Sequence, residues 1–220
     1  MYKISTLSAT KQGDERFQLE LEDGGLHEFH IWDYAFLYRY PNLYQQLIVE
    51  LLDCKIYQVM ENQLSRFIVP STPLKIVDVA CGSGLMGKYL HQHSSLSVHY
   101  LAGIDVIPDA LTALKRDTPN IYNDCYLASH NHQVLKQQNL NCMIICGAAN
   151  HIQLSDFKYY TSLLVNNAYL VFNLIEGKQP DIINWLNSQY KLLNSEAYTH
   201  RKLMNGTEVK HHAFIYKVNH

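Results

Sequence analysis

The stretch IVDVACGSGLMG, residues 76–87, decides the fold of this 220-residue chain. An apolar run leads into Gly82-Ser83-Gly84, and the residues after it have the apolar spacing of a helix face. Glycine lets the backbone turn tightly and lets a ligand approach where a Cβ would intrude. Gly87 completes a G-x-G-x-x-G pattern, whose third glycine allows close packing of helix on strand. The stretch predicts a strand, a tight turn and a helix whose N-terminus suits a partly negative ligand group.

Two acidic residues favour a ligand site over a purely structural turn. Asp78 stands between Val77 and Val79, where a buried carboxyl group is costly unless it has partners. Asp105 ends the next predicted strand, where a carboxylate can accept hydrogen bonds from both hydroxyls of a ribose. The alternative for Asp105 is an acid at a helix N-terminus, ahead of Pro108.

Short apolar runs alternate with helical stretches after Pro73. The expected strands cover 74–79, 98–104, 122–128, 142–146 and 169–174, and the expected helices cover 85–91, 110–115, 157–164 and 182–193. Apolar strands with helices between them indicate a parallel sheet covered on both faces. Two further strands, 195–204 and 207–218, flank Asn205-Gly206, the dipeptide preferred in a two-residue type I′ turn. The sequence therefore predicts an α/β fold: a doubly wound, mostly parallel sheet that ends in an antiparallel hairpin.

The segment before Pro70-Ser-Thr-Pro73 has a different pattern. Residues 15–31 alternate weakly around Gly24-Gly25, which predicts a hairpin, and 42–52 and 56–67 have helical spacing. We expect residues 1–72 to form this hairpin and a helical lid, and 73–220 to form a cofactor-binding core. Four tyrosines gather in the lid: Tyr34, Tyr38, Tyr40 and Tyr44.

Residues 73–220 resemble the class I S-adenosylmethionine (SAM)-dependent methyltransferases. The family's acid and glycine-rich turn match residues 78–84, with Ala80 in place of the first glycine. The positions that match cofactor-binding residues of the family are Asp78, Ala80, Cys81, Gly82, Gly84, Asp105, Val106, Ser129 and Gly147. The resemblance implies a Rossmann-like sheet of seven strands, the last reversed, and SAM as the cofactor, with S-adenosylhomocysteine as its product.

Three of these positions have distinct roles in the family. The resemblance implies that Val106 covers the adenine, that Ser129 stands near the adenine amine in place of an acid, and that Gly147 lies beside the transferable methyl group. Within the superfamily, the segments DVACGSGLMG, GIDV, IYNDCYL and ICGAANHI look most like the methyltransferase-like proteins of the Williams–Beuren type. That likeness implies a fold and a cofactor more than a reaction.

Methyl transfer depends chiefly on proximity, orientation and exclusion of water, with a base needed only when the acceptor carries a proton. His151, just past the strand 142–146, is the candidate base, and a surface-loop histidine is the alternative. Tyr34 is the candidate to close over cofactor or substrate, and lid packing is the alternative. Residues 150–153 lack the Asn/Asp-Pro-Pro-Tyr/Phe motif of base and glutamine-amide N-methyltransferases. We expect methyl transfer to an oxygen or nitrogen atom of a small molecule.

Two other functions fit the same motif. An NAD(P)-linked oxidoreductase uses a similar glycine turn, but needs further parallel βαβ units where this sequence predicts a hairpin. A non-catalytic SAM-binding module is compatible with Ala80 and with the missing acid at Ser129.

Composition narrows the partners. A net charge of −2 argues against binding to nucleic-acid phosphates, and the longest apolar stretch, 142–149, is too short to span a membrane. Five cysteines without a C-x-x-C pair, and an N-terminus without a signal peptide, suggest a reduced, cytoplasmic protein. The histidine pairs are scattered, so we expect no metal site. Oligomeric state stays open.

Overall fold

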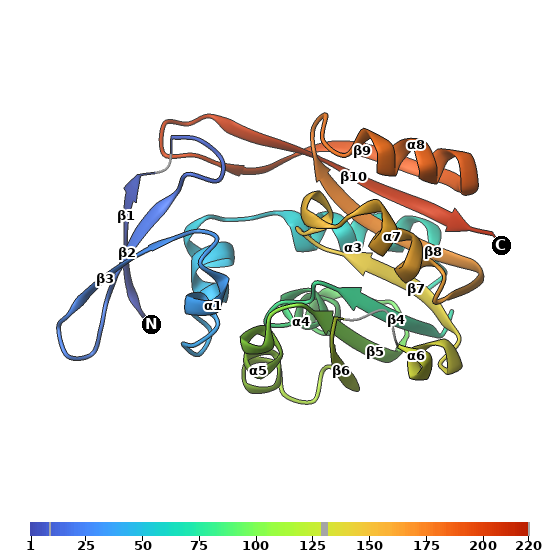
Figure 1. Ribbon diagram of the computed structural model, residues 1–220, viewed down its shortest axis with the longest axis horizontal. Coiled ribbons are helices and arrows are strands. Elements are labelled where there is room, and N and C mark those ends of the chain that lie inside the picture. Colours follow the sequence, from blue (N-terminus) through green and yellow to red (C-terminus); the bar gives the residue numbers. More distant parts are fainter. Residues whose placement is uncertain (9, 129–131, 220) are drawn as a thin grey trace.

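Seven strands form one mixed sheet, in the spatial order β6-β5-β4-β7-β8-β10-β9 (Figure 1). The computed structural model describes residues 1–8, 10–128 and 132–219. The strands are β4 (Leu74–Val79), β5 (Val98–Asp105), β6 (Asp124–Leu127), β7 (Leu140–Ile145), β8 (Leu164–Ile175), β9 (Lys191–Lys202) and β10 (Glu208–Val218). Strands β4 to β8 pair in parallel, and β10 runs antiparallel to both β8 and β9. The predicted α/β fold, with its reversed C-terminal hairpin, is confirmed.

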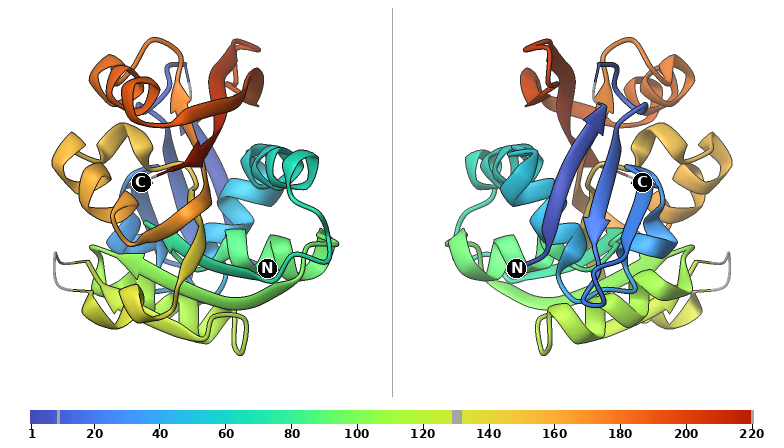
Figure 2. Two further views of the ribbon diagram at one scale, coloured as in Figure 1. Left: turned by 90° about the vertical axis from the view of Figure 1, so that its right-hand side faces the viewer. Right: turned by 90° about the vertical axis from the view of Figure 1, so that its left-hand side faces the viewer.

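Helices cover both faces of this sheet (Figure 2). One face packs against α3 (Ile56–Phe67) and α4 (Leu85–His93), and the other against α6 (Gln133–Gln137), α7 (Leu154–Thr161) and α8 (Pro180–Gln189). Helix α5 (Pro108–Asp117) lies on the α4 side, where Leu114 approaches Gly84. Alternate residues of β4 serve the two faces, since Ile76 belongs to the first core and Val77 to the second. The parallel strands therefore carry apolar residues on both faces.

The N-terminal part has a small core of its own. Strands β1 (Lys3–Ser8), β2 (Arg16–Glu20) and β3 (Leu26–His30) form an antiparallel sheet, so the predicted hairpin gains a third strand. Short helices follow: α1 (Tyr34–Leu37), α2 (Leu43–Gln45) and the π-helix η1 (Gln46–Leu51). They bury Leu37, Leu43 and Leu47 against Phe17 and Leu19. The stretch 42–52 is thus helical as predicted, although its second half is wound as a π-helix.

Two local predictions at the C-terminal end are wrong. Helix α8 ends at Gln189, and residues 191–193, predicted as helix, begin β9 because β10 offers them a pairing edge. The hairpin turn is not type I′, which needs positive φ at both central residues. Asn205 has a negative φ and Gly206 has φ 81°, and the Gly206 N–H donates to the Leu203 carbonyl at 2.9 Å. The loop closes with glycine alone in the left-handed region.

Candidate functional site

The turn between β4 and α4 has a left-handed backbone at three positions. Ala80 has φ 59°, Gly82 has φ 55° and Gly84 has φ 84°. An L-residue in this region costs about 1–2 kcal/mol, and glycine does not pay it. The structure therefore explains why a glycine suits position 80, and shows that this chain keeps a strained alanine there.

Tyr122 packs against the glycines of this turn. A Cβ on Gly87 would lie 2.5 Å from its Cε2 atom, which accounts for the close packing expected at Gly87. The Tyr122 hydroxyl accepts a hydrogen bond from the Gly87 N–H at 3.1 Å and donates one to Oδ2 of Asp78 at 2.6 Å. Tyr122 thus links the helix N-terminus to the buried acid. No motif in the sequence marks this role.

Asp78 is 1% exposed and only half satisfied. Its Oδ2 atom has Tyr122, whereas its Oδ1 atom has no hydrogen-bond partner in the described chain. Burial raises the pKa of Asp78 to about 7, although the Tyr122 hydrogen bond opposes the shift. A buried carboxylate oxygen without a donor is unfavourable by itself, so this atom suits a ligand that brings an N–H or O–H group.

Asp105 ends β5 directly beside the turn. Its Oδ2 atom accepts from the Gly82 N–H at 2.8 Å, and its Oδ1 atom accepts from the Ile107 N–H at 2.9 Å. Burial raises the pKa of Asp105, and these backbone hydrogen bonds lower it. The carboxylate is therefore fixed at the edge of the sheet where a ligand over the glycine turn would meet it.

Tyr38 fills the space above the turn. Its side chain is 5% exposed, and its hydroxyl lies 2.7 Å from where a Cβ on Gly82 would stand. The ring stacks on Tyr34 with 6.1 Å between centroids and meets Tyr44 edge-on at 5.2 Å. The cavity left between these rings and residues 78–82 measures only about 30 Å³.

Helix α5 holds the Tyr38 segment in place. The Arg116 guanidinium donates hydrogen bonds of 3.1 Å to the carbonyls of Tyr38, Arg39 and Tyr40. The neighbouring Asp117 accepts a 3.1 Å hydrogen bond from the Asn42 N–H. Residues 38–42 are thus attached to the same helix whose start follows Asp105.

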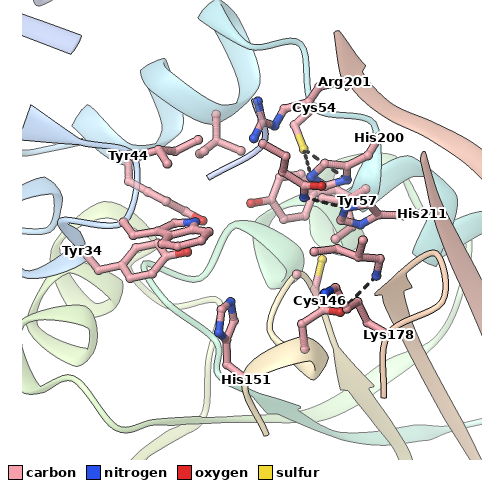
Figure 3. A pocket seen from close by; sticks show the side chains of 18 of the residues that line it. Tyr34, Tyr44, Cys54, Tyr57, Cys146, His151, Lys178, His200, Arg201 and His211 are labelled. Carbon is pink, nitrogen blue, oxygen red and sulfur yellow. Dashed lines mark hydrogen bonds between the residues drawn. The ribbon is translucent and has the colours of Figure 1, made fainter. Parts of the chain in front are cut away.

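A larger cavity of about 460 Å³ lies between the N-terminal sheet, the end of β7 and the C-terminal hairpin (Figure 3). Tyr34 and Tyr44 lie on one side of it, and His200, Arg201 and His211 lie on the other. Its remaining lining includes Trp32, Tyr57, Cys54, Gly147, Asn150, His151 and Lys178. The structure thus brings together three predicted residues, Tyr34, Gly147 and His151.

The polar wall of this large cavity is a directed hydrogen-bond network. The Gly147 N–H donates to Oδ1 of Asn173 at 2.8 Å, so the Asn173 amide nitrogen is the atom that faces Nδ1 of His211 at 2.8 Å. The other ring nitrogen of His211, Nε2, lies 3.0 Å from the side-chain amide nitrogen of Gln12, so both ring nitrogens have polar partners. Burial lowers the pKa of His211 to about 4, which keeps the ring neutral at pH 7.

Next to His211 lies a second histidine, paired with a cysteine. The His200 and His211 rings stack with centroids 4.0 Å apart, and Nε2 of His200 is 3.1 Å from Sγ of Cys54. Burial lowers the pKa of His200 and raises that of Cys54 to about 12. The pair is a neutral imidazole and a thiol, so Cys54 is no activated nucleophile.

An ion pair joins the N-terminal sheet to the hairpin behind this wall. Arg201 contacts the carboxylate of Glu15, and these residues are 6% and 0% exposed. Glu15 also accepts a hydrogen bond of 2.6 Å from the Gly13 N–H. Two segments far apart in the sequence are thereby held together at the cavity.

The other predicted site residues lie in different places. Asp78, Ala80, Cys81 and Gly82 line the small cavity, and Val106 is 73% exposed at the end of β5. Ser129 lies outside the described residues.

Among those described, no three His, Cys, Asp or Glu side chains gather in a metal-binding arrangement, and no helix has the length and apolarity needed to cross a membrane.

Comparisons with known proteins identify the fold. The chain matches no family model and no curated protein. A SAM-dependent methyltransferase from Anabaena variabilis is 16% identical with TM-score 0.57, over 86% of this chain and 94% of that one. One from Mesorhizobium loti is 13% identical with TM-score 0.54, over 71% and 96%. A putative tRNA (m1A22) methyltransferase from Streptococcus pneumoniae, in complex with SAM, is 11% identical with TM-score 0.55, over 72% of both chains. The fold is thus that of SAM-dependent methyltransferases, and likeness to the Williams–Beuren type stays a prediction.

Proposed function

We propose that this chain is a SAM-dependent methyltransferase that transfers a methyl group to an oxygen or nitrogen atom of a small molecule. One observation carries the proposal: the unpartnered Oδ1 atom of Asp78 and the fixed carboxylate of Asp105 flank a left-handed glycine turn. They do so at the carboxyl edge of parallel strands, where open α/β sheets bind ligands.

The residues around the turn suit the chemical parts of SAM. The Asp105 carboxylate would accept hydrogen bonds from the ribose hydroxyls. Oδ1 of Asp78 would accept a hydrogen bond from the ammonium group. The exposed side chain of Val106 would cover the adenine, while Ser129 and Gly147 keep the roles that the family resemblance implies. When bound, SAM supplies a methyl carbon on a positively charged sulfur.

The polar groups around the turn match this cofactor, but the cavity beneath Tyr38 is too small for it in this conformation. Ligand pockets for molecules of this size measure about 300–1,000 Å³, whereas the cavity beneath Tyr38 measures about 30 Å³. We therefore propose that SAM enters only after residues 34–42 move away from Gly82. The contacts that must break include the hydrogen bonds from Arg116 to this segment and the one from the Asn42 N–H to Asp117.

His151 is the best placed side chain for proton transfer. Of the three histidines that line the large cavity, His200 and His211 use ring nitrogens in the network described above. No hydrogen bond to the His151 ring occurs within the described residues, and Trp32 meets it edge-on at 6.0 Å. His151 can therefore accept a proton from an acceptor hydroxyl or amine.

Tyr34 has a different task. Burial raises the pKa of its hydroxyl, which keeps it protonated and able to donate a hydrogen bond. Its ring separates the large cavity from the Tyr38 side, so it can exclude water once a substrate is bound.

A small acceptor fits the molecule better than a nucleic acid. The large cavity measures about 460 Å³, within the range of small-molecule sites. The net charge of −2 offers no general attraction for a phosphate backbone.

Calorimetric titration tests the proposal. SAM and S-adenosylhomocysteine are titrated into the wild type, into Asp105→Ala and into Asp181→Ala, whose exposed acid on α8 serves as the matched control. We expect binding to the wild type and the control, and affinity at least about 10-fold weaker for Asp105→Ala because charged hydrogen bonds are lost. Absence of binding to the wild type would overturn the proposal, and binding of NADH instead would favour an oxidoreductase.

Catalysis needs a second measurement. Small-molecule extracts are incubated with the protein and SAM, and acceptors are found by mass spectrometry as molecules that gain one CH₂. We expect the His151→Ala variant to bind SAM normally and to lose turnover. Cofactor binding with no methylated product in any extract would instead support a non-catalytic SAM-binding module.

A further inference from the structure

The large cavity is lined by cationic side chains, and no Asp or Glu of the described residues lines it. Arg201 is buried in its wall and Lys178 lies at its mouth. The Nη1 atom of Arg201 forms an ion pair with Glu15, which does not itself line the cavity. Within the described part of the chain, Nε and Nη2 of Arg201 donate no hydrogen bond to another residue. A buried guanidinium therefore keeps donors for a ligand, and a guanidinium binds carboxylates best through two parallel hydrogen bonds.

The charge of Arg201 acts on titratable groups on both sides of the cavity. Besides burial, which is the larger cause, it lowers the pKa of His200 and His211 and opposes the rise of the pKa of Tyr34. The two imidazoles are neutral at pH 7, so they add hydrogen-bonding groups and no second charge. The cationic side chains of the lining are therefore Arg201, whose charge Glu15 partly offsets, and Lys178, and they favour an anionic group over an amine.

The opposite wall is made of rings. Trp32, Tyr34 and Tyr44 contribute these rings, and Tyr57 adds a further ring to the lining. The Trp32 ring rests on Gly13, where an added Cβ would lie 2.6 Å from the indole. The Gly13 N–H is bonded to Glu15, the partner of Arg201. One loop thus fixes both the aromatic wall and the cationic one.

We propose that this cavity binds the acceptor, and that the acceptor is a small aromatic carboxylate. Its carboxylate would bind Arg201 with support from Lys178, and its ring would pack against Trp32 and Tyr34. The volume of about 460 Å³ accommodates a substituted single or fused ring. That the bound carboxylate is the methyl acceptor rests on the proposed methyl transfer. That the cavity binds an aromatic carboxylate does not rest on it.

Fluorescence of Trp32 tests the binding without SAM. The chain has two tryptophans, so Trp185→Phe leaves Trp32 as the only one. This protein is titrated with 4-hydroxybenzoate and with the matched uncharged probe 4-hydroxybenzamide. We expect saturable quenching by the acid and at least about 10-fold weaker binding of the amide, because a hydrogen bond to a charged group is worth about 1.5–3 kcal/mol.

Variants then locate the charge. Arg201→Met is combined with Glu15→Gln, so that no buried acid is left unpaired, and folding is checked by circular dichroism. We expect this double variant to bind acid and amide alike. Lys178→Gln should weaken acid binding by about 3-fold, as suits an exposed charge, whereas Lys115→Gln on α5 should change nothing.

The other outcomes show whether the carboxylate assignment or the proposed methyl transfer fails. Equal affinity for acid and amide in the parent protein, or unchanged discrimination in the double variant, would overturn the carboxylate assignment. Competition between 4-hydroxybenzoate and S-adenosylhomocysteine would overturn it too, since the cavity would then belong to the cofactor. Binding of the acid with no binding of SAM would leave this inference standing and remove the proposed methyl transfer.

Discussion

The glycine turn and the large cavity lie at the same edge of the sheet, but they are built in different ways. The turn comes from two consecutive β-α connections and is packed so tightly that about 30 Å³ remains. The cavity draws its walls from the N-terminal loop, the end of β7 and the C-terminal hairpin, and about 460 Å³ stays open. Short-range sequence thus specifies the glycine turn and the position of Asp105, whereas the walls of the large cavity depend on long-range contacts. The following changes test that difference, from the largest effect to the smallest.

Arg201→Met tests how far the cavity depends on one long-range pair. Glu15 would be left as a buried, uncompensated charge, so we expect the free energy of unfolding to fall by about 3–5 kcal/mol. Urea denaturation measures it, and the double variant Glu15→Gln/Arg201→Met should recover most of the loss. A single variant within about 1 kcal/mol of wild type would show that the two regions do not differ in this way.

Asp78→Asn tests how much the buried carboxyl group beside the glycine turn lowers the free energy of unfolding. The pKa of Asp78 is raised from 3.8 to about 7, so the folded chain binds this proton more tightly than the unfolded chain does. The free energy of unfolding should therefore fall as pH rises from about 4 to about 7, in a way that the variant lacks. At pH 8 the variant should be more stable by up to about 4 kcal/mol, less the cost of burying its amide N–H.

Urea titrations at several pH values provide the measurement for Asp78. The matched control is Asp181→Asn on α8, whose pH dependence should follow the wild type. An Asp78→Asn protein that loses stability between pH 4 and 7 as steeply as the wild type would show that another group titrates there.

Tyr38→Ala should open the tight region, because Tyr38 lines the small cavity and does not itself line the large one. If residues 34–42 must withdraw before the cofactor binds, removal of the ring raises the fraction of competent molecules. We expect about 10-fold tighter binding of S-adenosylhomocysteine, measured by calorimetry. Tyr38→Phe keeps the ring and should bind like the wild type. Equal affinity of all three proteins would mean that Tyr38 does not block the site.

Ala80→Gly should give the smallest change. Relief of the left-handed alanine is expected to raise the free energy of unfolding by about 1 kcal/mol. Ala113→Gly, inside α5, should lower it by a similar amount because glycine weakens a helix interior. Thermal unfolding of both variants gives the comparison, and a loss of stability in Ala80→Gly would contradict it.

Local patterns carried most of what could be predicted at the cofactor edge. The alternation of apolar strands with helices predicted the sheet, and the strand-turn-helix pattern around Gly82 predicted its ligand edge. Asp105 could be placed because it directly ends a strand. Tyr122 could not, since its contact with Asp78 depends on how two strands lie in space. Strand β1 was also missed, because its pattern is half-buried and it is stabilised by pairing with β2.

The cavity shows why the rest could not be predicted. The histidines are scattered along the sequence, yet His200 and His211 stack because β9 and β10 pair. Arg201 had no visible partner, since Glu15 lies almost the whole chain away. The same limit explains the error at residues 191–193, whose strand pairing with β10 overrides a helical pattern.

The place of β10 inside the sheet has a consequence for synthesis on the ribosome. Strand β9 is translated before β10 but pairs only with it at the edge of the sheet. Until β10 has emerged, β9 has no strand to pair with, so Arg201 is not yet held in place and Glu15 lacks its counter-ion. The parallel strands can assemble early, while the large cavity closes only after β10 has left the exit tunnel.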